Sequence, residues 1–167
     1  HINQLWQTDC TDGIWLPDPQ GLKESRKTTL ITFIDDCSRL CLHGEFFWTE
    51  QLVDLLHCFK KALAARGKPG TVYSDNGPIY RAKDWSAICS SLGIGVKHSE
   101  AYQPSGKGKQ ERHYLTIQRR FYKEAKKSGI RTLEELNEFF FAWLEQCYHQ
   151  ELHRGIGMPP LERWQME

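Results

Sequence analysis

The sequence predicts an α/β domain: one five-stranded mixed sheet, with three antiparallel and two parallel strands, and helices on both of its faces. Two observations support this fold class. Short apolar runs separated by turn residues lie at 5–11, 27–35 and 40–47, which is the pattern of an antiparallel meander. A segment with helical periodicity, 49–67, then leads into another short apolar run at 71–75, and such helical crossovers join parallel strands.

Size and composition agree with a single domain. The chain has 167 residues, 40% of them hydrophobic and six of them Trp, which is enough for a substantial core. It begins at His1 rather than Met, so we expect residues 1–167 to be one domain of a longer protein. No apolar run approaches the roughly 20 residues of a membrane-spanning helix, and no secretory signal pattern is present, so we expect a cytoplasmic protein. The six Cys show no C-x-x-C spacing, which predicts reduced thiols.

The first strand, 5–11, contains Asp9, and the Pro-, Gly- and charge-rich residues after it predict a loop from 12 to 27. The next two strands are rich in β-branched and apolar residues, with a turn at 36–39 between them. Asp35 and Asp36 lie at this turn, where Asp side chains commonly bond the local backbone, so we assign them to the turn rather than to catalysis.

The crossover helix is predicted to start with Thr49 as its N-cap and Glu50 in its first turn, and to end at Gly67. The strand at 71–75 follows and carries Asp75 to its C-terminal tip, just before the turn pair Asn76-Gly77. A short helix at 81–92 and a short strand at 94–98 come next.

Residues 99–108 contain two Gly and one Pro without apolar periodicity, which predicts a mobile lid. A long helix follows at 109–127. On its helical wheel one apolar stripe contains Tyr114, Ile117, Phe121 and Ala125, another face contains Arg112, Arg119, Lys123 and Lys126, and Glu111 falls at the border. Thr132 and Glu135 then form a capping box that opens a final helix, 132–147, whose aromatic stripe predicts core packing.

Positive charge is concentrated around Glu111. Residues 97–131 hold ten Lys or Arg and three Glu, a balance of +7, whereas the rest of the chain has a balance of −6. A local basic field of this kind favours binding to a polyanion, because each neutralised phosphate releases counterions. The alternative is an ordinary solvated helix face.

Three carboxylates can converge in this arrangement: Asp9 on one strand, Asp75 at the tip of another, and Glu111 near the start of the long helix. Clustered carboxylate oxygens suit hard divalent cations such as Mg²⁺. The segments 6–11, 74–77 and 102–112, together with the thirty-five residues between Asp75 and Glu111, resemble the catalytic core of the DDE recombinases, the family of retroviral integrases and insertion-sequence transposases.

The resemblance implies an RNase H-like fold and a polynucleotidyl transferase that cleaves DNA strands and transfers them. It implies that Asp9, Asp75 and Glu111 are catalytic and hold two Mg²⁺ ions, for which Mn²⁺ can substitute. The implied partners are DNA, as element ends and target, and further copies of the chain in a homo-oligomer, with a nucleoid-associated location. We assign phosphate contacts to Lys107, Lys109, Arg112 and Arg119, and base-edge contacts to Gln110 and His113.

Several alternatives stay open. Leu115 and Gln118 stand where viral integrases place lysines, and the 13–26 segment enlarges the spacing from Asp9 to Asp75, so a bacterial insertion-sequence transposase is favoured over a virus. A metal-dependent nuclease of the RNase H-like group, or a catalytically silent DNA-binding module on this fold, are the rival functions. Zinc binding by Cys147, His149 and His153 is disfavoured because no matching fourth ligand is evident.

Overall fold

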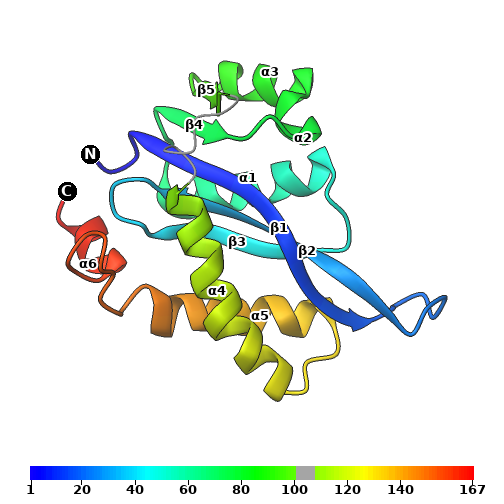
Figure 1. Cartoon of the computed structure of the whole chain (residues 1–167). Coiled ribbons are helices and arrows are strands. Elements are labelled where there is room, and N and C mark those ends of the chain that lie inside the picture. Colours follow the sequence, from blue (N-terminus) through cyan, green and yellow to red (C-terminus); the bar gives the residue numbers. More distant parts are fainter. Residues whose placement is uncertain (101–107) are drawn as a thin grey trace.

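The computed structural model describes residues 1–100 and 108–167 (Figure 1). Its five-stranded sheet has the order β3-β2-β1-β4-β5. The strands are β1 (Leu5–Pro17), β2 (Ser25–Asp35), β3 (Cys41–Phe47), β4 (Thr71–Ser74) and β5 (Gly95–His98). The first three pair antiparallel, whereas β4 pairs parallel with β1 and β5 parallel with β4. The predicted mixed sheet is confirmed.

Helices cover both faces of this sheet. They are α1 (Leu52–Arg66), α2 (Pro78–Arg81), α3 (Lys83–Ser91), α4 (Gly108–Lys127), α5 (Leu133–Trp143), the π-helix η2 (Leu144–Tyr148) and α6 (Pro160–Gln165). Side chains alternate across β2, so Phe33 packs with α1 and α3 on one face, while Ile34 packs with α4 and α5 on the other. The predicted apolar stripe of α4 lies in this second core, and Thr132 caps α5 with Glu135 as expected.

The hairpin formed by β1 and β2 corrects the predicted loop at 12–27. Residues 12–17 pair with 25–29 across a bulge between Asp12 and Trp15, so only 18–24 connect the strands. Ile14 and Leu16 are buried in the α4–α5 core, and this burial supports the extension of β1 despite the Gly and Pro beside it. The Asp18 carboxylate then accepts N–H bonds from Gln20, Leu22 and Lys23 and closes the turn.

Smaller corrections concern the helix ends. The N-cap of α1 is Gln51 rather than Thr49, and the Asp54 carboxylate accepts bonds from the Gln51 N–H and the Thr49 hydroxyl. The predicted helix at 81–92 is two short helices that meet at Ala82, and the last turn of the predicted 132–147 helix becomes η2.

Two further expectations concern the chain as a whole. All six cysteines are free thiols, as predicted. In the two described segments, no helix combines the length and the apolar character that crossing a membrane requires.

Candidate active site

Asp9 lies on β1, and Asp75 directly follows the neighbouring parallel strand β4. The register of β1 and β4 pairs Leu5 with Thr71 and Gln7 with Tyr73, and two residues further along each chain come Asp9 and Asp75. Adjacent strands lie only about 4.8 Å apart, so this register brings the two carboxylates to one region of the sheet. Burial raises the pKa of the Cys10 thiol, and the negative charges of Glu50, Asp9 and Asp75 raise it further.

Local backbone contacts orient both carboxylates. The Cys10 N–H donates to Asp9 Oδ1 at 2.9 Å, and the Gly77 N–H donates to Asp75 Oδ1 at 2.7 Å. A Cβ at position 77 would lie 2.9 Å from Asp75 Oδ1, so a larger residue there would displace this carboxylate. Asn76 Nδ2 donates to the Ser99 carbonyl at 2.7 Å and ties the same turn to the end of β5. The Asp-Asn-Gly sequence therefore forms a hydrogen-bonded turn that orients the Asp75 carboxylate.

Glu50 is an acidic neighbour that sequence reasoning missed as a site residue. Partial burial, followed by the charges of Asp75 and Asp12, raises the pKa of Glu50. The sequence placed Glu50 in the first turn of the crossover helix, whereas it precedes the N-cap, Gln51. No local pattern reports this proximity, because it arises from the pairing of β1 with β4 and from the position of α1 beside them.

Glu111 lies in the first turn of α4 and is exposed to solvent. One turn later, the buried Tyr114 hydroxyl donates to the backbone carbonyl of Asp9 and accepts a bond from Thr32 Oγ1 at 3.0 Å. These bonds tie α4 to the sheet at Asp9, and α4 contacts β1. Within residues 1–100 and 108–167, however, no three His, Cys, Asp or Glu side chains are grouped closely enough to hold a metal ion. The register of β1 and β4 brings Asp9 and Asp75 to one region of the sheet, whereas the described residues form no three-carboxylate group, so the catalytic triad stays a prediction.

Comparison with known protein families assigns the chain that carries this site. The profile of the integrase core domain matches residues 1–104, which include Asp9 and Asp75. The chain belongs to the integrase core domain family.

Relatives of this integrase core are both viral and bacterial. It is 32% identical to the Gag-Pro-Pol polyprotein of sheep pulmonary adenomatosis virus over 74% of this chain and 7% of that protein. It is 23% identical to the transposase for transposon Tn552 of Staphylococcus aureus over 97% of this chain and 37% of that protein. The predicted relationship to integrases and transposases is confirmed, whereas a bacterial origin stays a prediction. The chain spans little more than a third of the transposase and a small part of the polyprotein.

Its fold is also that of a solved integrase. The HTLV-2 integrase catalytic core domain in complex with magnesium, in its trimeric form, aligns with a TM-score of 0.71 over 98% of this chain and 95% of that one, at 20% identity. This likeness confirms the RNase H-like fold predicted from the sequence.

The residues predicted to contact DNA phosphates fall into three groups. Lys107 lies outside the described residues. Arg112 and Arg119 are exposed on α4, and their phosphate contacts stay a prediction. Lys109 is half-buried, and its Nζ lies 2.7 Å from both carboxylate oxygens of Asp36. A phosphate contact by Lys109 therefore requires that this ion pair opens.

The base-edge contacts predicted for Gln110 and His113 are corrected by the structure. Only 4% of Gln110 and 3% of His113 is exposed, because both side chains lie on the sheet-facing side of α4. His113 Nδ1 bonds the Tyr148 hydroxyl at 3.1 Å. Burial, with the charges of His149 and His153, lowers the pKa of His113 to about 3, so the imidazole is neutral at physiological pH. The two residues are part of the packing beneath the site.

Proposed function

We propose that this integrase core is a polynucleotidyl transferase that cleaves DNA strands and transfers them, with Asp9, Asp75 and Glu111 as its catalytic carboxylates. The single observation that carries the proposal is the placement of Asp9 on β1 and of Asp75 directly after the adjacent parallel strand β4, with α4 bonded to the Asp9 carbonyl one turn from Glu111. Membership of the integrase core domain family supports the same chemistry.

The donor set fits Mg²⁺, the ion named with the HTLV-2 core domain, because carboxylate oxygens are the ligands that this hard cation prefers. Asp9, Asp75 and Glu111 would hold two such ions. Bound in pairs, such ions activate a water or a DNA 3′-hydroxyl and stabilise the charge on the leaving 3′-oxygen.

The protein's own residues supply position and charge. The backbone bonds to Asp9 and Asp75 hold the carboxylates in place before the metal arrives, which reduces the reorganisation that binding requires. Arg112 and Arg119 attract the phosphate backbone without reading its sequence. Cleavage and joining are then the same phosphoryl-transfer reaction, with water as the nucleophile in cleavage and a DNA 3′-hydroxyl as the nucleophile in joining. We further propose that the substrates are element ends and target DNA in the cytoplasm, and that the active complex is a homo-oligomer.

The test uses the full-length enzyme, a DNA end with a free 3′-hydroxyl, a target duplex and Mg²⁺. Joining is expected, whereas cutting alone would indicate a nuclease and binding alone a DNA-binding scaffold. The Asp9→Asn, Asp75→Asn and Glu111→Gln variants should each lose joining while keeping DNA affinity, because the carboxylates serve the transition state and the cations bind phosphates. Asp84→Asn, at an exposed position of α3, is the matched control. Substantial joining by any one of the three variants removes that residue from the triad.

A further inference from the structure

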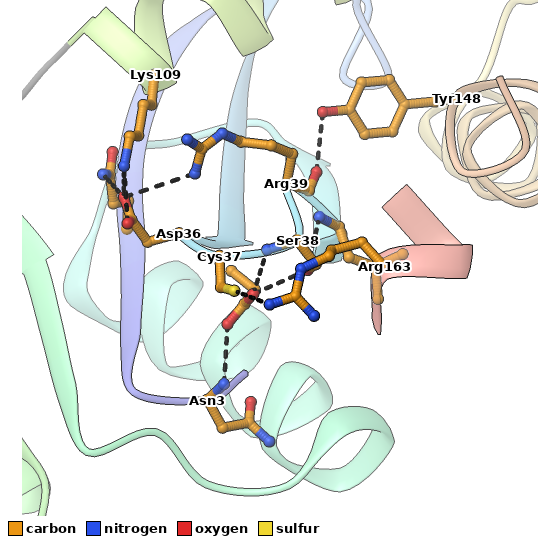
Figure 2. A network of polar contacts seen from close by, with 11 residues as sticks. Asn3, Asp36, Cys37, Ser38, Arg39, Lys109, Tyr148 and Arg163 are labelled. Carbon is orange, nitrogen blue, oxygen red and sulfur yellow. Dashed lines mark hydrogen bonds and ion pairs between the residues drawn. The ribbon is translucent and has the colours of Figure 1, made fainter. Parts of the chain in front are cut away.

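Asp36, in the turn between β2 and β3, is the centre of a polar network (Figure 2). Its two carboxylate oxygens each lie 2.7 Å from Lys109 Nζ. Gln7 Nε2 donates to Asp36 Oδ1 at 2.6 Å, and Arg39 Nη1 lies 3.8 Å from the same oxygen. The Asp36 carboxylate therefore interacts with a lysine from α4, a glutamine from β1 and an arginine from its own turn.

The positions of these partners connect the network to the proposed active site. Gln7 is two residues before Asp9 on β1, and Lys109 is two residues before Glu111 on α4. Asp36 is bonded to both elements, yet it carries none of the proposed catalytic groups. It joins the strand and the helix on which Asp9 and Glu111 lie.

The turn that carries Asp36 is firmly anchored. Asp35 is fully buried, and its carboxylate accepts bonds from the Asn3 N–H at 3.0 Å, the Ser38 N–H at 2.7 Å and the Ser38 hydroxyl at 2.8 Å. The Asp36 N–H donates to the Leu5 carbonyl at 2.9 Å. These bonds fix the position of the turn, so the Asp36 carboxylate can hold the side chain of Lys109 in place.

A second contact joins the same turn to α4. The Tyr148 hydroxyl donates to the Arg39 carbonyl at 3.0 Å and also bonds His113 Nδ1. His113 is four residues after Lys109, so the two lie on the same side of α4. Glu111 projects about 200° around the helix from Lys109, close to the side on which Tyr114 contacts Asp9. The contacts of Lys109 and His113 on one side and Tyr114 on the other therefore set the rotation of α4 about its own axis.

The Lys109–Asp36 ion pair lies nearer the N-terminal end of α4 than the contacts of His113 and Tyr114. The first backbone N–H groups of a helix have no intrahelical partners, and helix ends fray. Glu111 lies within this first turn, ahead of the bonds made by His113 and Tyr114. Among the described residues, the ion pair with Asp36 is the polar side-chain contact that the first turn of α4, with Glu111, makes to another element.

We propose that Asp36 is a positioning residue: through Lys109 it holds the first turn of α4 so that Glu111 is presented towards Asp9 and Asp75. This inference rests on the proposed function, because it assigns a role to Asp36 in presenting Glu111. It also gives Lys109 a structural task, since an ammonium shared between two carboxylate oxygens contributes little net charge to a DNA phosphate.

The experiment compares Asp36→Asn, Lys109→Met and the double variant in the full-length enzyme, with Asp84→Asn as the matched control. Three quantities are measured: the single-turnover joining rate at saturating DNA, the Kd for DNA, and amide hydrogen exchange in 108–114 and 117–125. Asp36→Asn is expected to slow joining by about 10- to 100-fold, the range for residues that orient metal ligands. Its Kd should stay within about threefold of wild type, and exchange should accelerate in 108–114 alone.

The double variant provides the decisive comparison. If Asp36 acts through Lys109, joining by the double variant is no slower than by the slower single variant, because the same contact is already lost. Multiplicative losses would overturn the proposal, as would a rise in Kd that matches the loss of rate, which would make the pair a DNA contact. Unchanged exchange in 108–114 of Asp36→Asn would also overturn it. A wild-type enzyme that fails to join DNA refutes the proposed function instead, and the exchange data then still decide whether Asp36 holds this turn.

Discussion

Tyr114→Phe removes one buried hydroxyl that connects α4 to β1. Only 6% of Tyr114 is exposed, and its hydroxyl donates to the Asp9 carbonyl while accepting from Thr32 Oγ1 at 3.0 Å. Phe keeps the ring and its packing beside Ile117 and Phe121. The substitution therefore isolates the two hydrogen bonds from the apolar contacts of the same side chain.

The expected loss of stability depends on the two groups that the Tyr114 hydroxyl bonds, the Thr32 hydroxyl and the Asp9 carbonyl. Thr32 is fully buried, so its own hydroxyl loses its partner out of reach of water, at a cost of about 1–3 kcal/mol. The half-buried Asp9 keeps some access to water, which reduces the cost of losing this bond at its carbonyl. We expect a loss of about 2 kcal/mol in the free energy of unfolding, and at about 2–4 °C per kcal/mol for a domain of this size, a fall in Tm of about 4–8 °C.

Urea unfolding of the purified domain measures this loss, and Tyr122→Phe on the same helix is the matched control. The Tyr122 hydroxyl donates to the carbonyl of Asp12, which is exposed, so water replaces that bond and the expected cost is below about 0.5 kcal/mol. Equal destabilisation by the two substitutions would refute the assignment of Tyr114 as the buried tether. Full-length Tyr114→Phe should also join DNA more slowly, because the tether lies one turn from Glu111.

Two further predictions concern metal and pH. Millimolar Mn²⁺ should raise the Tm of the wild type more than that of Asp75→Asn, because a ligand that binds only the native state stabilises it; equal shifts would place the ion elsewhere. Below about pH 6.5, the ordinary pKa of histidine, His113 is protonated in the unfolded chain. In the folded chain its pKa is about 3, so the buried imidazole stays neutral over this range. The free energy of unfolding should therefore fall as the pH drops from 6.5 towards 3, by at most about 1.4 kcal/mol per pH unit from this residue. Urea titrations between pH 4 and 7 should show a shallower fall in His113→Gln than in the control His57→Gln, and parallel curves would contradict the assignment.

The fold was predictable wherever the hydrophobic period was local and uninterrupted. The stripe of Tyr114, Ile117 and Phe121 correctly placed one side of α4 against the sheet. The extension of β1 to Pro17 was missed because Gly13 and Pro17 mimic a loop, while the pairing that stabilises the strand comes from β2. Turn chemistry was informative at 36–39, where Asp35 does bond the local backbone.

Two site residues were misassigned because their polarity was given more weight than their position. Gln110 and His113 lie on the helical wheel beside Tyr114 and Ile117, so the spacing itself indicated burial. The role of Asp36 had no such signal. Its partners Gln7 and Lys109 are 29 and 73 residues away in sequence, and only the folded sheet brings them to the turn.

The same tertiary contacts change how the basic charge of residues 97–131 should be counted. Lys109 is paired with Asp36, and Arg120 is paired with Glu151 at 2.7 Å while it lies over the Trp143 ring. Each such pair reduces the charge available to a phosphate, whereas Arg112 and Arg119 are exposed on the same helix. Each cation that does release counterions contributes about 0.9 to the slope of log Kd against log salt. Because paired cations contribute less, the salt dependence of DNA binding should be weaker than the formal balance of +7 implies, and Arg119→Ala should flatten it more than Arg120→Ala. Affinity measurements for the two variants across a salt series would show this order, and the reverse order would mean that the Arg120–Glu151 pair opens on DNA.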